Sequence, residues 1–336
     1  MNERDLISRI MAMVPEKRDS DLLLAMGDDC AVVDRDGQRV LLYSTDALIE
    51  KVHFDLSWHP PFLLGRKAVS VNVSDVAAMG GSPLYLLFSL GLPKRFDDQW
   101  AGELCRGVLD ACEQYECMLI GGDTVASPAG ITLGLTVIGE MEKERVVYRS
   151  GARQGDIVSV SGPLGSAAAG LELCRQGCAG QKHFEPLCRS HLDPRARVRL
   201  GQSLAAAGCA HAMMDLSDGL ATDLGHICRA SRVDAVVYED QLPFHPALRK
   251  AADLLKVEPV RWMLAGGEDY ELLVIAPPDA TKKLQERVAG LGHVLYPVGR
   301  ITAGEEGKVR LAGSAGEEHA GAVAVEFSGY DHFSPD

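Results

Sequence analysis

The amino-acid sequence of this protein has no apolar stretch long enough to cross a membrane as a helix. It also has no run of Lys and Arg, and no interleaving of basic with aromatic residues. It has 34 Lys and Arg residues and 47 Asp and Glu residues. The resulting net charge of −13 argues against a nucleic-acid-binding surface. We therefore expect neither a membrane nor a nucleic acid among its partners.

Paired cysteines are missing as well. The nine cysteines form no CxxC motif, and several of them, including Cys105, Cys112 and Cys228, lie in apolar helical patterns. Residues 1–5 do not have the character of a secretory signal. We therefore expect reduced thiols in a cytoplasmic protein.

The common catalytic signatures are also missing. The sequence contains no GxxxxGK[ST] loop, no GxGxxG turn and no HRD/DFG pair, which excludes P-loop enzymes and the protein-kinase fold. No HExxH motif or cysteine cluster indicates zinc, and no GxSxG elbow indicates a serine hydrolase. An acidic protein that handles phosphates would need metal ions to reconcile the charges.

What the sequence does contain is a repeated pattern, in which aspartate stands beside Gly, Ser or Thr near the end of an apolar run. The instances are Gly27-Asp28-Asp29, Ser44-Thr45-Asp46, Gly121-Gly122-Asp123-Thr124 and Asp215-Leu216-Ser217-Asp218-Gly219. Taken alone, each aspartate is more often a turn or cap residue than a ligand. The glycines would let the backbone approach a phosphate closely, and the hydroxyls are hard oxygen donors.

Asp75 has no such ordinary explanation. Residues 60–79 are predicted to form a long helix of small apolar residues, in which Asn72 and Asp75 share one face at i and i+3. A carboxylate in this setting is costly unless a partner or a cation neutralises it. If the other aspartates converge on Asp75, they form an oxygen-only site of the kind that holds Mg²⁺ against phosphates.

The pattern of elements predicts two domains. Residues 40–44, 83–92, 118–120 and 131–140 are predicted strands that alternate with helices, as in an α/β layer. A polar, turn-rich segment at 149–156 marks the boundary, so we place the domains at 1–150 and 151–336. Strands 40–44 and 131–140 would leave open sheet edges in a monomer, which predicts a homodimer through the first domain.

Other candidates lie outside the aspartate motifs. His53 lies just beyond the Asp46 strand, and Arg149 is either a solvated charge or a clamp on nucleotide phosphates. Glu268 follows paired glycines, so it is either a turn residue or a substrate contact. Phe327 belongs to an aromatic C-terminal segment that either packs on the second domain or stacks on a heteroaromatic substrate.

Together these motifs closely resemble the thiamine-monophosphate kinases, a family of the aminoimidazole-ribonucleotide-synthetase-like ATP-binding superfamily. The resemblance is carried, in order, by Gly27-Asp28-Asp29-Cys30-Ala31, Ser44-Thr45-Asp46, His53-Phe54, Asn72-Val73-Ser74-Asp75, Gly121-Gly122-Asp123-Thr124, Arg149-Ser150-Gly151-Ala152, Asp215-Leu216-Ser217-Asp218-Gly219 and Gly266-Gly267-Glu268-Asp269. It implies an N-terminal α/β domain, whose sheet pairs with that of another subunit, and an α+β C-terminal domain.

The resemblance also implies roles for individual residues. The Mg²⁺ ligands would be Asp29, Ser44, Thr45, Asp46, Asp75, Asp123, Asp215 and Asp218, with Asp75, Asp123 and Asp215 as the catalytic members. ATP contacts would be Gly121, Gly122, Arg149 and Ser217. Contacts to thiamine monophosphate would be His53, Glu268 and Phe327, although many relatives have Trp at the last position. Spacing alone does not decide whether Asp28 or Asp29 binds metal.

The implied reaction converts ATP and thiamine monophosphate into ADP and thiamine diphosphate, with several Mg²⁺ ions. One alternative is another ATP-activating enzyme of the superfamily, such as a cyclo-ligase or a selenophosphate synthetase. Residues 1–24 contain no Cys, which argues against the synthetase. A second alternative is a nucleotide-binding module with a decayed site, but all the matched carboxylates are present.

Overall fold

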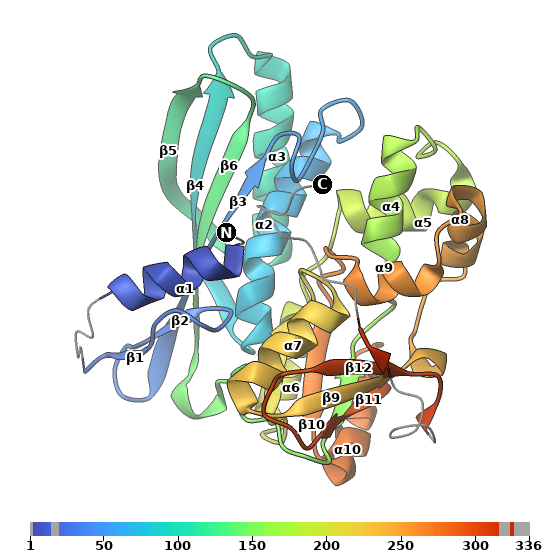
Figure 1. The fold of residues 1–336 in the computed structure, drawn as a ribbon. Coiled ribbons are helices and arrows are strands. Elements are labelled where there is room, and N and C mark those ends of the chain that lie inside the picture. Colours follow the sequence, from blue (N-terminus) through green and yellow to red (C-terminus); the bar gives the residue numbers. More distant parts are fainter. Residues whose placement is uncertain (1–2, 15–19, 316–322, 326–336) are drawn as a thin grey trace.

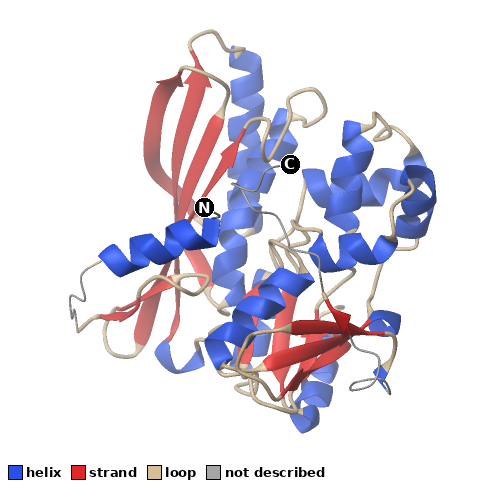
Figure 2. Ribbon diagram, in the orientation of Figure 1, coloured by secondary structure: helices blue, strands red, loops and turns tan. Residues whose placement is uncertain are grey.

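The computed structural model of the chain describes residues 3–14, 20–315 and 323–325. These residues form two β-sheets with helices packed around them (Figures 1 and 2). The strands of the first sheet all precede residue 143, and those of the second all follow residue 156. Among the residues described, no helix combines the length and the apolar character needed to cross a membrane.

The first sheet has six strands in the order β1-β2-β3-β6-β4-β5. Their bounds are β1 Leu22–Leu24, β2 Ala31–Asp34, β3 Arg39–Ile49, β4 Ser82–Pro93, β5 Met118–Ser127 and β6 Thr132–Glu142. Only the β4–β5 pair is parallel. The helices of this half are α1 (Glu3–Met13), α2 (Pro61–Ala78) and α3 (Asp98–Gln114), and a 3-10 turn, η1 (Lys143–Arg145), follows β6.

The second sheet has seven strands in the order β13-β12-β9-β11-β7-β10-β8. Their bounds are β7 Ile157–Val160, β8 Ala212–Asp215, β9 Asp234–Tyr238, β10 Leu272–Ala276, β11 Tyr296–Thr302, β12 Val309–Ala312 and β13 Val323–Ala324. The helices of this half are α4 (Ser166–Arg175), α5 (Glu185–Leu192), α6 (Val198–Ala206), α7 (Leu220–Ser231), α8 (Ala247–Leu255), α9 (Pro259–Ala265) and α10 (Pro278–Ala289), with 3-10 turns η2 (Lys182–Phe184) and η3 (Glu239–Gln241).

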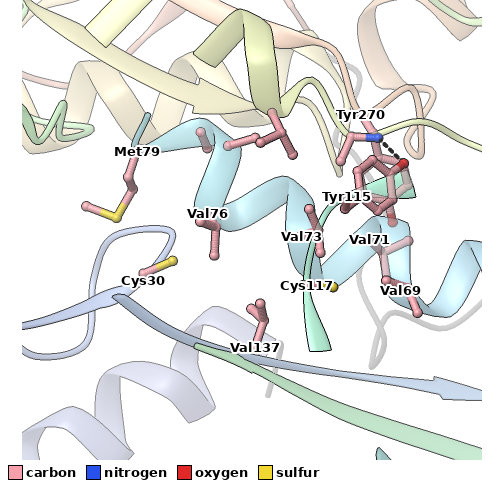
Figure 3. Close-up of a cluster of buried hydrophobic side chains, with 14 of the residues drawn as sticks. Cys30, Val69, Val71, Val73, Val76, Met79, Tyr115, Cys117, Val137 and Tyr270 are labelled. Carbon is pink, nitrogen blue, oxygen red and sulfur yellow. Dashed lines mark hydrogen bonds between the residues drawn. The ribbon is translucent and has the colours of Figure 1, made fainter. Parts of the chain in front are cut away.

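Helix α2 lies between the two halves of the molecule (Figure 1). It starts at Pro61, at a position where the missing N–H costs no hydrogen bond. It ends before Gly80, whose φ of 84° suits glycine. Most of its residues are buried, because α2 contacts β3 and β6 as well as α6 and β8. Figure 3 shows its side chains Val73 and Val76 within the core.

The prediction about sheet edges was wrong. Strand β3 is longer than residues 40–44, because it pairs with β6 along its whole length from Arg39 to Ile49. Both β3 and β6 are interior strands, and the edges of this sheet are β1 and β5. Asp46 therefore lies within a strand and not after one.

The predicted short buried strand at 118–120 was also wrong. Strand β5 continues to Ser127, because it pairs in parallel with β4 as far as Pro93, and most of its residues are exposed. The glycine pair that was expected to follow the strand is part of it. A Cβ on Gly122 would lie 1.8 Å from the carbonyl oxygen of Phe88, so glycine is required there by close strand packing next to a register shift.

Candidate functional site

Three carboxyl groups from separate parts of the chain meet beside α2. Asp29 precedes β2, Asp75 lies on α2 and Asp215 ends β8, and one oxygen of each lies within 4.8 Å of the others. We call these three residues the acidic cluster. Two serines hold it in place: Ser44 Oγ donates to Asp75, and Ser74 Oγ donates to Asp215 Oδ2 over 2.6 Å.

The cluster is electrostatically unfavourable by itself. Burial raises the pKa of Asp29 to about 8 and that of Asp215 to about 6. Burial, followed by the Asp46 and Asp215 carboxylates, raises the pKa of Asp75 well above its usual value. Arg149 offsets part of the charge, because its Nε and Nη2 lie 3.1 and 2.5 Å from Asp29 Oδ1. An oxygen-only set with one arginine partner fits a hard divalent cation such as Mg²⁺.

Two members of the acidic cluster, Asp75 and Asp215, line a cleft of about 420 Å³ that is formed by residues of both halves. Asp46, Asp75, Asp215, Ser217 and Asp218 line one part of it, and His53 and Glu268 contribute further polar groups. The remaining wall is largely apolar, and it is formed by Ala47, Leu48, Val52, Val71, Ala168, Leu171 and Tyr270 together with Arg175 and Gly267. Such a cleft can hold a polyanion at its acidic part, through metal ions, and an organic ring against its apolar wall.

Backbone hydrogen bonds join two segments of the second half that line the cleft, one at 215–218 and one at 267–271. Glu268 N donates to Ser217 O over 2.8 Å, Tyr270 N donates to Leu216 O over 2.9 Å, and Leu216 N donates to Glu271 O over 2.8 Å. Gly267 permits this approach, since a Cβ there would lie 2.5 Å from Ser217 O. The segment that carries Asp215, Ser217 and Asp218 is thereby fixed against the segment that carries Glu268.

Comparison with known proteins places the chain in a family. The family model of "AIR synthase related protein, N-terminal domain" matches residues 27–141, and that of the C-terminal domain matches 153–312. The thiamine-monophosphate kinase of Escherichia coli (strain K12) is 38% identical, with 99% of this chain and 98% of the relative covered. That of Bacillus subtilis (strain 168) is 33% identical, with 99% and 100% covered. The chain belongs to the thiamine-monophosphate kinase family.

Solved structures agree with this assignment and confirm the expected fold. The structure of AaThiL complexed with AMPPCP and TMP matches with a TM-score of 0.85 and 35% identity, over 99% of this chain and 97% of that one. Thiamine-monophosphate kinase from Stenotrophomonas maltophilia K279a matches with a TM-score of 0.76 and 36% identity, over 93% and 97%. Hydrogenase maturation protein HypE, at 22% identity and a TM-score of 0.72, has the same fold.

Asp28 and Asp29, between which sequence spacing could not decide, have different surroundings in the structure. Asp29 is the residue whose carboxylate joins the acidic cluster. Asp28 accepts hydrogen bonds from the backbone N–H groups of Arg149 and Asp29, both at 3.0 Å. Asp28 thus ties the start of β2 to the residue that ends the first half of the chain.

The hydroxyls of the Ser44–Thr45 pair point in different directions. Ser44 contacts Asp75, as described above, whereas Thr45 Oγ1 donates to Leu135 O over 2.8 Å and lies 3.1 Å from Thr136 Oγ1. The Thr45 hydroxyl is therefore engaged along the sheet. His53 Nδ1 accepts a hydrogen bond from Ile49 N at 3.0 Å, which fixes the orientation of the ring at the cleft.

Gly121, Gly122 and Asp123 lie away from the acidic cluster within one chain. Asp46 pairs with Leu135, which pairs with Phe88, which pairs with Gly122. These residues therefore lie three strand spacings from Asp46, or roughly 14 Å across the sheet. Phe327 falls outside the residues that the structure describes.

Sequence reasoning missed three charged or polar residues near the cleft. Lys67 is buried on α2 and pairs with Glu268, His191 on α5 contacts the same carboxylate, and Arg175 lines the cleft from α4. Lys67 could have been found by the argument used for Asp75, because it is a charge inside an apolar helix. His191 and Arg175 had no such signal, since only packing brings α4 and α5 to this position.

Proposed function

We propose that this protein transfers the γ-phosphoryl group of ATP to the phosphate of thiamine monophosphate, giving thiamine diphosphate and ADP. The observation that carries the proposal is the acidic cluster beside a cleft that also contains Glu268 and whose remaining wall is largely apolar. The relatives named above support it, since they are thiamine-monophosphate kinases, and AaThiL has been seen with AMPPCP and TMP.

The residues present fit Mg²⁺. The carboxylates of the cluster have raised pKa values, and within the described part of the chain Arg149 is their one cationic partner, so a divalent cation would relieve their mutual repulsion. We propose that the ligand set is Asp29, Ser44, Thr45, Asp46, Asp75, Asp123, Asp215 and Asp218, with Asp75, Asp123 and Asp215 as its catalytic members. When bound, the ions supply charge neutralisation for two approaching phosphate groups.

The protein groups position the two substrates. Arg149 and Ser217, with Gly121 and Gly122, are proposed to contact ATP. His53, Glu268 and Phe327 are proposed to contact the acceptor. The acceptor phosphate is already ionised, so no general base is needed, and catalysis rests on orientation and charge stabilisation.

An exposed apolar row on the first sheet supports a homodimer. Tyr43, Ile138, Tyr85 and Met118 are register partners that form a row across β3, β6, β4 and β5. Tyr43, Tyr85 and Met118 are 36%, 43% and 64% exposed, so the row forms an uncovered apolar surface. We propose that two chains pack these surfaces together as a homodimer, and that Asp123 serves the site of the partner.

Two broader assignments accompany the proposal. The domains are proposed to be residues 1–150 and 151–336, since β6 ends at Glu142 and β7 begins at Ile157. The protein is proposed to be cytoplasmic, which is supported by nine cysteines that are all free. Its net charge of −13 supports small anionic substrates with metal ions over a nucleic-acid partner.

Product analysis tests the proposed function directly. Purified protein is incubated with ATP and Mg²⁺ and with thiamine monophosphate, free thiamine or aminoimidazole-pathway acceptors. We expect thiamine diphosphate from the monophosphate alone. Phosphorylation of thiamine but not of its monophosphate, or turnover of an aminoimidazole acceptor, would contradict the proposal.

A further inference from the structure

A fully buried lysine lies on α2, eight residues before Asp75. Lys67 has an exposed fraction of 0%, and its Nζ lies 2.5 Å from Glu268 Oε1. Burying an ammonium group is costly unless it is paired. The Lys67–Glu268 ion pair therefore joins the central helix to the loop of the second half that lines the cleft.

Glu268 is held from three directions. Lys67 binds Oε1, His191 Nδ1 donates to Oε2 over 2.7 Å, and the backbone N–H of Glu268 donates to Ser217 O. Its φ of 70° is uncommon for a residue with a side chain and is sustained by these contacts. Burial alone would raise the pKa of Glu268, but Lys67 and His191 hold that pKa well below its usual range.

His191 acts as a neutral donor in this arrangement. Burial and the nearby Lys67 ammonium both lower the pKa of His191, so its ring is uncharged at neutral pH. Among the described residues, Lys67 is thus the cation that balances the negative charge of Glu268. Glu268 differs in this respect from Asp46 and Asp75, for which no ion pair with Lys or Arg is found among the described residues.

Helix α2 also separates the Lys67–Glu268 ion pair from the acidic cluster at Asp75. Eight residues of α-helix span about 12 Å along the axis, so Lys67 and Asp75 mark two distinct zones of one rigid element. Near Asp75, the three carboxyl groups of the acidic cluster are accompanied by one cationic side chain among the described residues, that of Arg149. At the Lys67 end, one carboxylate has its own permanent cation and faces the cleft with both oxygens fixed.

We propose that Lys67 is a positioning residue that keeps Glu268 ionised and fixed as a hydrogen-bond acceptor for the organic part of the acceptor substrate. This inference deepens the proposed function and rests on it, because it assigns Glu268 to the acceptor and not to ATP.

The test is a kinetic comparison based on Lys67→Met. Without the ammonium, burial favours the protonated form of Glu268, which no longer offers an ionised hydrogen-bond acceptor. We expect the KM for thiamine monophosphate to rise at least ~10-fold, as for loss of a charge-assisted contact. The KM for ATP, and the melting shift produced by Mg²⁺ with a non-hydrolysable ATP analogue, should stay near wild type.

Arg66→Met is the matched control. Arg66 is the neighbouring buried cation on α2, and its Nε lies 2.8 Å from Asp193, while its Nη1 pairs with Asp110 outside the cleft. This variant should lower the melting temperature without changing the KM for thiamine monophosphate. Equal changes of that KM in both variants would show that Lys67 only stabilises the fold, and would overturn the inference.

A double variant keeps the inference testable if the Lys67→Met protein does not fold. Lys67→Met combined with Glu268→Gln removes both charges, so it should regain melting temperature while the KM for thiamine monophosphate stays high. A wild-type KM in either Lys67 variant overturns the inference. Absence of thiamine diphosphate formation by the wild-type protein would instead reject the proposed function, so the two failures are distinguishable.

Discussion

At the scale of single residues, Asp75 is the strongest test of the metal site. Asn has the same shape as Asp but no charge, so Asp75→Asn should leave the metal-free protein no less stable than wild type, because one repulsive carboxylate is removed. Activity should fall at least ~100-fold, as when one strong electrostatic contact to the transferring group is lost. Turnover and melting temperature are measured on the same preparation.

The melting temperature distinguishes a metal-binding role of Asp75 from a purely structural role. Ligand stabilisation follows affinity for the folded state, so Asp75→Asn should lose the gain in melting temperature that Mg²⁺ produces with a non-hydrolysable ATP analogue. If Asp75 only accepts the hydrogen bond from Ser44, the variant would change stability while its Mg²⁺ response and its rate stayed near wild type.

The buried Asp215 predicts a pH dependence. Burial raises its pKa from 3.8 to about 6, so the folded state disfavours its ionised form. The favourable contribution of Asp215 is complete below pH 3.8 and is lost as the pH rises through about 6. In the absence of metal, Asp215→Asn should therefore melt several degrees above wild type at pH 8, and the difference should shrink at pH 5.

Thermal melts from pH 5 to pH 8, with and without Mg²⁺, check this expectation. Mg²⁺ should reverse the order at pH 8, because the ion stabilises the carboxylate of the wild-type protein but not the amide of the variant. A difference between the two proteins that is the same at every pH would contradict the assigned cause.

At the scale of elements, the close packing of α2 against α3 gives a paired prediction. A Cβ on Gly107 would lie 1.9 Å from Phe62 O, whereas a Cβ on Gly102, on the same helix, would meet nothing within 4 Å. Gly107→Ala should destabilise the protein by about 1–3 kcal/mol through overpacking. Gly102→Ala should stabilise it by roughly 0.5–1 kcal/mol, because Ala is the better helix former.

Chemical denaturation of the two variants makes the comparison, since both carry the same substitution in the same helix. Equal free energies of unfolding would mean that α3 can move away from α2 at little cost. Unequal values in the expected direction would show that the position of α2, and with it that of Asp75 and Lys67, is fixed by backbone contact with α3.

At the scale of the whole molecule, the exposed apolar row predicts a homodimer. Tyr85→Glu places a charge in the centre of that row and should give a monomer mass by light scattering at micromolar concentration, where the wild type gives a dimer. Leu109→Glu is the control, because Leu109 is also an exposed apolar residue, at 54%, but lies on α3. A wild-type protein of monomer mass would refute the proposal.

Mixed dimers test whether Asp123 acts across the interface. Asp75→Asn and Asp123→Asn chains should each be inactive alone. If Asp123 serves the partner, a mixed dimer has one site with both aspartates, and random pairing restores about a quarter of wild-type activity. No recovery after verified subunit exchange would place Asp123 in the site of its own chain or outside any site.

The sequence by itself determined what depends on neighbours along the chain. Helix α2 was predicted within a residue or two, because Pro60 and Pro61 start it, Gly80 ends it and its apolar residues continue between them. The family followed from motifs that are local and ordered. The anomaly of Asp75 could also be recognised locally, because a charge within an apolar helix requires an explanation wherever the helix packs.

Only the tertiary structure decided what depends on distant partners. The pairing of β3 with β6 made both strands interior, and the pairing of β5 with β4 extended the predicted strand at 118–120 into an exposed strand whose glycines lie far from Asp46. The approach of Asp29 to Asp215, which places Asp29 and not Asp28 in the acidic cluster, and the ion pair of Lys67 with Glu268 both join residues more than a hundred positions apart. Strand pairing and buried charge pairing are set by global packing, which no local window of the sequence contains.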